Sequence, residues 1–267
     1  MAETLQSIQK YIDAQELKKA EIAISRLLRQ QHGHGTHVRL LLQRARVRLL
    51  ANRAEDAIQD LHDLQHTYPG ALRQPTALEL LADAHLARFE AAQVGFADRA
   101  DVHTAQDIYQ SILTEFPAYV NRGWVNYQLG RIYLILDHVS AARQHFEQAF
   151  FLPSHVRALT AYCFERLGFI AYYEDRNPKQ ARILLVKATQ TYPDDAPTLW
   201  LAQVHMLLSR VLRTSHPDDA LDAAHRAVRI ANRIILDRVP LSEALFNLAE
   251  TLSALPDQSS AVIETIN

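Results

Sequence analysis

The chain has 267 residues, of which 48% are hydrophobic and 22% are charged, so it has enough apolar side chains for a sizeable folded core. Its formal net charge of −2 argues against a general attraction to nucleic acid or anionic lipid. The single cysteine, Cys163, excludes an intrachain disulfide and a cysteine-rich zinc site. No stretch reaches the ~20 apolar residues of a membrane span. We therefore expect a mostly helical, cytoplasmic protein without a cofactor.

The first predicted element is a helical hairpin over residues 1–34. Its start is amphipathic and mixed in charge, so we expect a terminal cap rather than a secretory signal. The sequence HGHGTH at 32–37 follows. His32, His34 and His37 have the close spacing that zinc, nickel or copper sites use, but no cysteine or acid is nearby. We favour a solvated turn between two hairpins over a metal site.

A second hairpin is predicted over 38–71, and its first helix is rich in arginine. Arg39 and Arg46 lie seven residues apart and share one helix face, whereas Arg44 and Arg48 share another. Such a helix could contact phosphate or an acidic partner. Because the charges are spread around the helix, a solvated surface is the favoured interpretation.

The third predicted hairpin, 75–119, is irregular because the segment 86–104 carries extra residues. Gly95 interrupts a helix-like run. We expect an extended first helix, a loop over 95–102, and a second helix led by Asp101. The loop is either functional or an insertion that the fold tolerates, since long surface loops cost little.

The fourth and fifth hairpins, 123–156 and 161–195, carry the clearest pattern. In LGRIYLILDHVSAARQHFEQAF small residues face large aromatic ones at regular spacing. Small side chains at matching heights let two helices approach closely, and the aromatic side chains fill the space around that contact. The fifth hairpin also contains Cys163, which we interpret as a structural thiol because no basic residue is placed to stabilise a thiolate.

A sixth hairpin over 200–235 and a cap over 240–267 complete the chain. The sequence DDALD at 218–222 has the spacing with which helical prenyl and terpene synthases bind magnesium. We favour a structural interpretation, in which the acids open a helix after a proline and Ala220 is a packing residue. The cap is expected to break at Pro256.

A repeated alanine ties these segments together. Residues four and seven positions after it are mostly apolar, as on one face of a helix, and a proline follows about twelve positions later in several units. A single hairpin of this kind cannot bury its apolar face, so neighbouring hairpins must stack. The repeated positions are Ala20, Ala57, Ala105, Ala142, Ala181, Ala220 and Ala261.

This pattern resembles the tetratricopeptide repeat (TPR) family. The best match is 123–156, where Leu129-Gly130, Tyr133, Ala142, Phe146, Ala149 and Pro153 follow the order of the family's marker residues. Residues 161–195 match through Phe164, Leu167-Gly168, Ala181, Ala188 and Pro193, and 38–71 through Ala45, Ala57, Leu61 and Pro69. Most units exceed the family's ~34-residue period. The resemblance implies an all-α fold, a single right-handed superhelical solenoid of antiparallel helical hairpins over 1–267.

The resemblance also implies where a partner binds. In the family, first helices line a concave groove that holds a segment of another protein. Transferring the inner positions of the family onto this sequence gives a list of candidate partner-binding residues. They are Arg39, Leu42, Arg46, Glu79, Asp83, Trp124, Tyr127, Arg131, Tyr162, Glu165, Phe169 and Tyr172.

Packing between helices is an equally good interpretation of Trp124 and Phe169. The lysine, asparagine and arginine set with which some family members clamp a C-terminal carboxylate is not found. The familiar nucleophile-elbow, zinc-protease, P-loop and dinucleotide-binding motifs are also absent from the sequence.

The sequence therefore predicts a non-enzymatic scaffold that binds another polypeptide, or a subunit of an assembly. A helical enzyme that uses DDALD with magnesium is one alternative. An RNA-binding helical repeat that uses Arg39 and Arg46 is another, although nucleic-acid binding would favour a larger basic excess.

Overall fold

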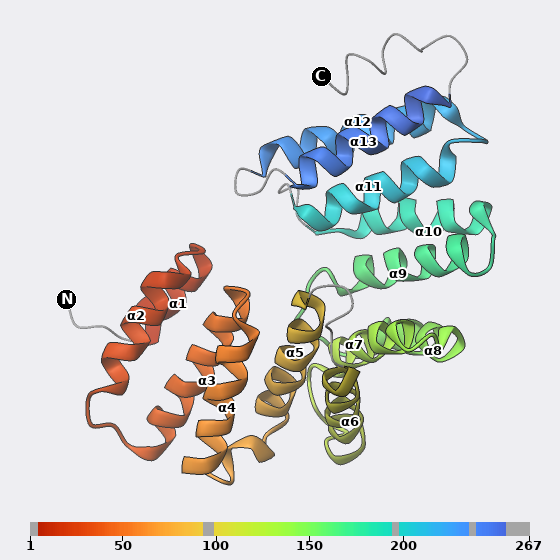
Figure 1. Ribbon diagram of the computed structural model, residues 1–267. Coiled ribbons are helices and arrows are strands. Elements are labelled where there is room, and N and C mark those ends of the chain that lie inside the picture. The colour runs from red at the N-terminus through yellow and green to blue at the C-terminus, as the bar shows by residue number, and fades with distance from the viewer. Residues whose placement is uncertain (1–4, 93–98, 194–197, 235–238, 255–267) are drawn as a thin grey trace. The chain divides into compact units, whose positions relative to one another are not determined.

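The computed structural model describes residues 5–92, 99–193, 198–234 and 239–254 (Figure 1). Within these ranges the chain forms helices and no strand. The helices gather into two compact units, Met1–Tyr119 and Val120–Asn267, called unit 1 and unit 2 below. The predicted all-α fold is confirmed. That the hairpins form one continuous solenoid over 1–267 stays a prediction.

Unit 1 contains three pairs of consecutive helices. In each pair, the second helix packs against the first. The helices are α1 (Leu5–Asp13), α2 (Leu17–Leu28), α3 (His34–Leu50), α4 (Ala54–Thr67), α5 (Pro75–Ala91) and α6 (Arg99–Glu115), with a 3-10 turn, η1 (Ala71–Arg73), before α5.

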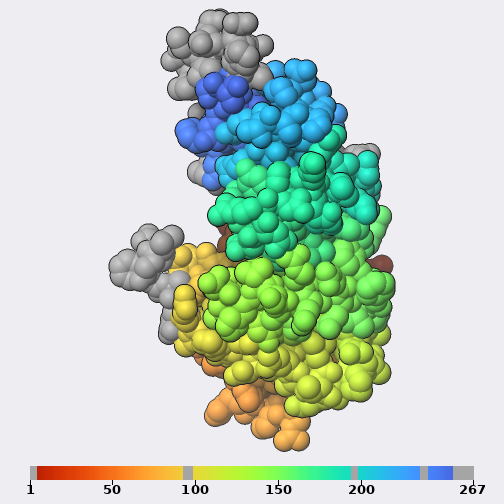
Figure 2. Space-filling view, turned by 90° about the vertical axis from the view of Figure 1, so that its right-hand side faces the viewer, coloured from red at the N-terminus to blue at the C-terminus, as the bar shows by residue number. Residues whose placement is uncertain are grey.

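Unit 2 contains three further pairs and one more helix. Figure 2 shows its hairpins as successive bands of surface, from yellow-green to blue. The helices are α7 (Arg122–Ile135), α8 (Val139–Ala149), α9 (Leu159–Tyr173), α10 (Pro178–Thr191), α11 (Leu199–Leu212), α12 (Pro217–Arg233) and α13 (Val239–Ser253).

The repeated alanines lie at the contacts between helices, as the sequence predicts. Each one in the described part of the chain is fully buried on the second helix of its hairpin. They are Ala20, Ala57, Ala105, Ala142, Ala181 and Ala220. Ala261 lies outside the described residues. A larger side chain at these positions would push the two helices apart, so the alanines set the spacing within each hairpin.

Glycines on two first helices lie directly against large side chains of the second helix. A Cβ atom added to Gly130 in α7 would lie 2.6 Å from Cε1 of Phe146 in α8, and one added to Gly168 in α9 would lie 2.9 Å from Leu185 of α10. Phe146 and Leu185 are themselves fully buried. Each glycine therefore provides the space that the large side chain opposite occupies.

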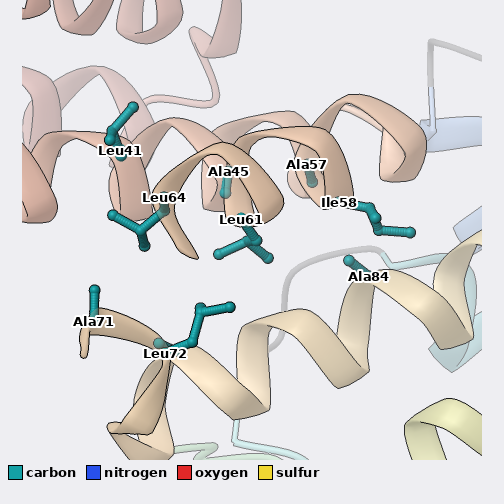
Figure 3. Packing of buried hydrophobic residues seen from close by; sticks show 10 residues of the cluster. Leu41, Ala45, Ala57, Ile58, Leu61, Leu64, Ala71, Leu72 and Ala84 are labelled. Atoms are coloured by element: carbon teal, nitrogen blue, oxygen red, sulfur yellow. The ribbon is translucent and has the colours of Figure 1, made fainter. Parts of the chain in front are cut away.

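Neighbouring hairpins share apolar cores. In unit 1, Leu41 and Ala45 of α3 meet Leu61 and Leu64 of α4, and Leu72 of η1 approaches the same cluster from below (Figure 3). The cluster extends onto α5, so it joins the second hairpin to the third. This is the stacking that an amphipathic hairpin needs to bury its second face.

The turns inside four hairpins repeat one backbone feature. A residue with left-handed φ lies five positions before the repeated alanine: Gln15, Asn52, Asp137 and Arg176, with φ between 53° and 63°. In the first, second and fourth hairpins the next residue donates its backbone N–H back to a carbonyl in the last helical turn, as from Arg53 to Arg48 at 2.9 Å. This bond pattern ends the first helix in a Schellman motif and fixes the return of the second.

Several expected helix ends are confirmed. Pro69, Pro117 and Pro193 each follow the last residue of a second helix by two positions, because proline cannot continue a helix. Pro217 opens α12, and Asp218 and Asp219 of DDALD lie exposed in its first turn. The expected break at Pro256 lies outside the described residues.

The irregular third hairpin differs from the prediction at one end. Helix α6 begins at Arg99, so residues 99–102 of the expected loop are helical. Asp101 is buried and accepts hydrogen bonds from Arg88 of α5, at 2.6 and 2.8 Å, and from His85 at 2.7 Å. The Arg88 and His85 bonds outweigh the effect of burial, and the pKa of Asp101 lies below its usual value. This network holds the start of α6 against α5. Residues 93–98 lie outside the described residues.

The solvated turn predicted at HGHGTH is wrong in its second half. Helix α3 begins at His34, and the rings of His34 and His37 lie 4.3 and 5.7 Å from the ring of Tyr68 at the end of α4. His32 lies 2.7 Å from the carbonyl of Leu27. His32 and His37 are half-buried beside these neighbours, whereas His34 stays exposed, as expected for a solvated segment.

The solvated surface predicted for the arginine-rich helix is also wrong for two residues. Arg44 and Arg48 approach the buried carboxylate of Asp60 on α4 at 2.6 and 2.8 Å, and Arg48 also bonds to Glu21 on α2 at 3.0 Å. Burial raises the pKa of Asp60, and the two arginines oppose that rise. Because Arg48 reaches both neighbours, it ties the first hairpin to the second.

The glycine contact predicts that Gly130→Ala lowers the free energy of unfolding, because the methyl group would overlap the buried ring of Phe146. Overpacking costs about 1–3 kcal/mol, and after the ~1 kcal/mol that alanine gains over glycine inside a helix the net loss is up to about 2 kcal/mol. Chemical denaturation measures the change. Gly35→Ala is the matched control, since an added Cβ there meets nothing within 4 Å. Equal effects of the two substitutions would contradict the packing role of Gly130.

The left-handed turns predict that Arg176→Gly raises the free energy of unfolding by about 0.5–1 kcal/mol, because glycine adopts this backbone conformation without steric cost. Ser215→Gly, at the corresponding position of the α11–α12 turn, is the control. Its φ is not left-handed, so glycine there should bring no gain. Thermal unfolding of the two variants separates these outcomes.

Candidate partner-binding face

Aromatic rings connect the first helices of unit 2. Trp124 and Tyr127 of α7 stack with ring centroids 5.3 Å apart, and Tyr127 lies 5.9 Å from Tyr162 of α9. Tyr162 in turn meets Trp200 of α11 edge-on at 5.0 Å. Tyr127 is buried, whereas the other three side chains are half-buried and keep part of their surface open. We call the surface of α7, α9 and α11 that carries these rings the first-helix face.

Charged groups lie beside the rings. Arg131 of α7 donates to Gln128 at 2.8 Å, and Arg166 of α9 donates to Glu165 at 2.6 Å. Glu165 is 6% exposed, while Arg131 and Arg166 are half-buried. The guanidinium of Arg166 also lies over the ring of Phe169, 5.8 Å from its centroid. The face therefore combines aromatic and arginine side chains, which dominate the energetics of many protein interfaces.

Burial controls the charge state of the groups within this face. It raises the pKa of Glu165, and the positive charges of Arg166 and Arg131 oppose that rise. Burial also raises the pKa of Tyr127 to about 12, against the same two arginines. The phenol of Tyr127 is therefore neutral near pH 7.

The C-terminal end of α9 extends the aromatic surface. The ring of Phe169 lies 4.6 Å from that of Tyr173, and Arg210 of α11 donates to the Tyr173 hydroxyl at 2.6 Å. Tyr172 packs against the apolar core shared by α9, α10 and α11, as Trp200 does. Both side chains are half-buried, so Tyr172 stays a predicted partner-binding residue that also contributes to packing.

In unit 1, two of the predicted partner-binding residues bond within the unit. Glu79 accepts a hydrogen bond from Tyr119 at 2.9 Å, and Asp83 accepts one from Tyr109 of α6. Tyr109 is fully buried. These carboxylates hold α5 against the residues that follow it, and their role in partner binding stays a prediction.

The other predicted residues of unit 1 lie on α3. Arg39 and Arg46 are exposed, and Arg39 donates to the carbonyl of Gly35 at 3.3 Å. Leu42 is half-buried against the core that α3 shares with α4 and α5. Unlike Arg44 and Arg48, the exposed pair forms no ion pair within the described residues.

Sequence reasoning missed Arg166 and Trp200. Trp200 stands near the start of α11, as Trp124 does in α7, which is a signal in the sequence. Trp124 precedes the small contact residue of its helix, Gly130, by six positions, whereas Trp200 precedes its counterpart, Leu208, by eight. The family positions transferred from one hairpin to the next therefore do not include Trp200. Arg166 follows Glu165 directly, and only the structure shows that it bonds to its neighbour.

Helix α11 buries polar groups beside the face. His205 is buried, and its Nδ1 atom finds no hydrogen-bond partner in the described part of the chain. Burial, together with the charges of Arg226 and Arg229, lowers the pKa of His205 to about 4. One turn further, Ser209 lies 3.0 Å from Thr251 and joins α11 to α13.

The other candidate sites of the sequence have structural environments. Cys163 is buried, and burial raises the pKa of its thiol to about 12, as expected for a structural cysteine. Asp219 of DDALD lies 3.9 Å from Arg182 of α10. Over the described residues, no group of three or more histidine, cysteine and acidic side chains is arranged to hold a metal ion.

No protein-family model matches the sequence, and a search of curated proteins found no match. Solved structures do match. A chain of the APC/C hetero-tetramer Cut9-Hcn1 has a TM-score of 0.64 at 16% identity, covering 88% of this chain and 41% of its own. The human IFIT1 dimer with m7Gppp-AAAA has a TM-score of 0.62 at 14% identity, covering 94% and 53%.

A third match covers both chains almost completely. The tetratricopeptide repeat protein from Parabacteroides merdae has a TM-score of 0.52 at 13% identity, with 98% of this chain and 95% of the other aligned. The fold is TPR-like. The chain spans only 41% and 53% of the Cut9-Hcn1 and IFIT1 chains that it matches.

The rings of Trp124, Tyr162 and Trp200 lie on the first helices of successive hairpins. That a partner binds on these helices stays a prediction. None of the described helices combines the length and the apolar character that a membrane crossing needs.

The buried imidazole predicts a pH dependence of stability. Its pKa falls from 6.5 to about 4 on folding, so the unfolded chain binds more protons between these values. The neutral His205 side chain therefore contributes fully to the free energy of unfolding above pH 6.5. This contribution falls by up to about 3 kcal/mol as the pH is lowered toward 4. Urea unfolding of wild type and His205→Leu across this range measures the difference.

His225→Leu, at an exposed position of α12, is the control for that experiment. The wild type and the control should lose stability together below pH 6.5, while His205→Leu should lose less. Parallel curves for all three proteins would show that the His205 imidazole is not buried in its neutral form.

Proposed function

We propose that this chain is a non-enzymatic, TPR-like scaffold whose first-helix face in unit 2 binds a segment of a partner polypeptide. The observation that carries the proposal is the row of rings from Trp124 through Tyr162 to Trp200 across three successive hairpins. Each outer ring of this row keeps part of its surface open. Rigid aromatic side chains give a large contact area at a small cost in conformational entropy.

The setting of these rings supports a binding role in addition to a packing role. Tyr127 is buried against Phe146 of α8, so it anchors the row in the core of its hairpin. The rings of Trp124 and Tyr162 both contact the ring of Tyr127. A preformed surface of this kind lowers the ordering cost that a partner must overcome.

The exposed pair Arg39 and Arg46 of α3 is proposed as a secondary contact. Leu42 lies between them in sequence, and its half-buried side chain gives the pair an apolar neighbour. The IFIT1 structures contain capped or triphosphate RNA, whereas this chain carries a net charge of −2, which disfavours a long phosphate backbone. Protein binding is therefore the favoured function.

The proposal predicts that a random peptide library displayed on phage yields binders on the full chain. Trp124→Ala should weaken a selected peptide on the order of tenfold or more, because hot-spot aromatics commonly contribute at least that much. Fluorescence polarisation with the labelled peptide measures the affinity. Phe151→Ala is the matched control, since Phe151 is 89% exposed and lies beyond α8 instead of on the face.

Circular dichroism of each variant verifies that the fold is intact. Hydrogen exchange with bound peptide should show protection in α7, α9 and α11. A library that yields no binder, or binders equally sensitive to both substitutions, would contradict the proposal.

A further inference from the structure

Helix α3 of unit 1 exposes one line of basic and apolar side chains. From Thr36 to the end of the helix, the exposed side chains are those of Arg39, Arg46 and Leu50. At 3.6 residues per turn, these three positions lie within about 40° of one another around the helix axis. Leu50 is 49% exposed, and Leu42 is half-buried at the edge of the line. We call this surface of α3 the basic stripe.

The fold does not use the charges of this stripe. Arg39 donates to a backbone carbonyl of its own helix at 3.3 Å, and neither Arg39 nor Arg46 forms an ion pair with a described residue. Arg44 and Arg48 of the same helix are instead neutralised by Asp60. Two positive charges therefore remain for a partner, about 10 Å apart along α3 at a rise of 1.5 Å per residue.

Helix α13 of unit 2 exposes a surface with the complementary charge. Glu243 and Phe246 are exposed, and Glu250 is half-buried on the same side of the helix. Phe246 is 66% exposed, and within the described helices it is the only exposed phenylalanine, tyrosine or tryptophan. The opposite side of α13 carries Ala244 and Leu248, which are buried against α12. We call the exposed surface of α13 the acidic stripe.

The acidic stripe also has charge that the fold leaves available. Glu243 forms no ion pair with a described residue. Glu250 accepts a hydrogen bond from Arg213 through Oε2 at 3.1 Å, while its Oε1 atom has no hydrogen-bond partner among the described residues. A carboxylate can accept from more than one donor. Glu243 is therefore the principal negative charge of the stripe, and Glu250 is a further acceptor.

The two stripes match position by position. On α3, Leu42 follows the first arginine by three positions and precedes the second by four. On α13, Phe246 follows the first acid by three positions and precedes the second by four. Two helices that lie side by side and parallel, in this register, bring each acid beside an arginine and the phenylalanine ring beside a leucine.

From this complementarity we infer that the chain associates with itself, with the acidic stripe of α13 in one copy docked on the basic stripe of α3 in another. Glu243 then pairs with Arg39, and Phe246 packs on Leu42. Because the two surfaces differ, the contact is heterologous, and each copy carries one surface of each kind. This self-association goes beyond the proposed function: it assigns a second copy of the chain to the secondary contact on α3 and leaves the first-helix face to another partner.

Sedimentation velocity of the full chain over a range of concentrations tests this contact. We expect the weight-average mass of the wild type to rise with concentration. Arg39→Glu and Glu243→Arg should each weaken the association on the order of tenfold, because each replaces an attraction between opposite charges by a repulsion. The two substitutions combined in one chain should restore most of the loss, because the pair is then present with its charges exchanged.

Arg39→Glu combined with Glu147→Arg is the matched control. Glu147 is an exposed acid of α8, outside both stripes, so this variant has the net charge of the wild type but should still associate weakly. Phe246→Ser should weaken the association as well, whereas Phe151→Ser, which removes the other exposed phenylalanine, should not. Circular dichroism of each variant verifies that the fold is intact.

Three results would overturn this self-association. They are a wild type that stays monomeric at every concentration, an association that survives both Arg39→Glu and Glu243→Arg, and equal restoration by the two double variants. A monomeric wild type that retains a single-stranded uridine oligonucleotide, with retention lost in Arg39→Glu, would assign the arginines of α3 to RNA instead. Peptide binding at Trp124 is measured separately, so the proposed function and the self-association can each fail without the other.

Discussion

The close contact between a small side chain on one helix and a large one on its partner determines the rest of this structure. Gly130 against Phe146 and Gly168 against Leu185 set how near the helices of a hairpin lie. That distance decides which residues of the first helix face the partner helix and which remain for other contacts. Trp124 and Tyr162 each precede the glycine of their helix by six positions, so the rings lie on a different side of the helix from the glycine contact.

Much of this architecture could be predicted from the sequence. The repeated alanines, and the prolines that follow them, define hairpins because helix packing and helix termination depend on local residue types. The backbone conformation of the turns was harder to predict from the sequence. Asn52 and Asp137 are residue types that tolerate left-handed φ, but Gln15 and Arg176 adopt it without a residue preference that would have revealed it. Their conformation follows from the closure of the hairpin around the buried alanine.

The candidate site was predictable in part, and the limit was the pairing of charges. Arg39, Arg44 and Arg48 look alike in sequence, yet Arg44 and Arg48 neutralise a buried aspartate and Arg39 is exposed and donates to the carbonyl of Gly35. Spacing along one helix shows which residues share a face. It does not show which group on another hairpin lies opposite, and that partner separates a structural arginine from a candidate contact residue.

The chain has two tryptophans, and both are in the aromatic row of unit 2. Indole emission shifts with the polarity around the ring, and both indoles are half-buried at the protein surface. The tryptophan fluorescence of the native protein thus arises from the surface proposed to hold a partner. Excitation of the unlabelled chain would report occupancy of that surface directly, without an attached dye and with no background from tryptophans elsewhere.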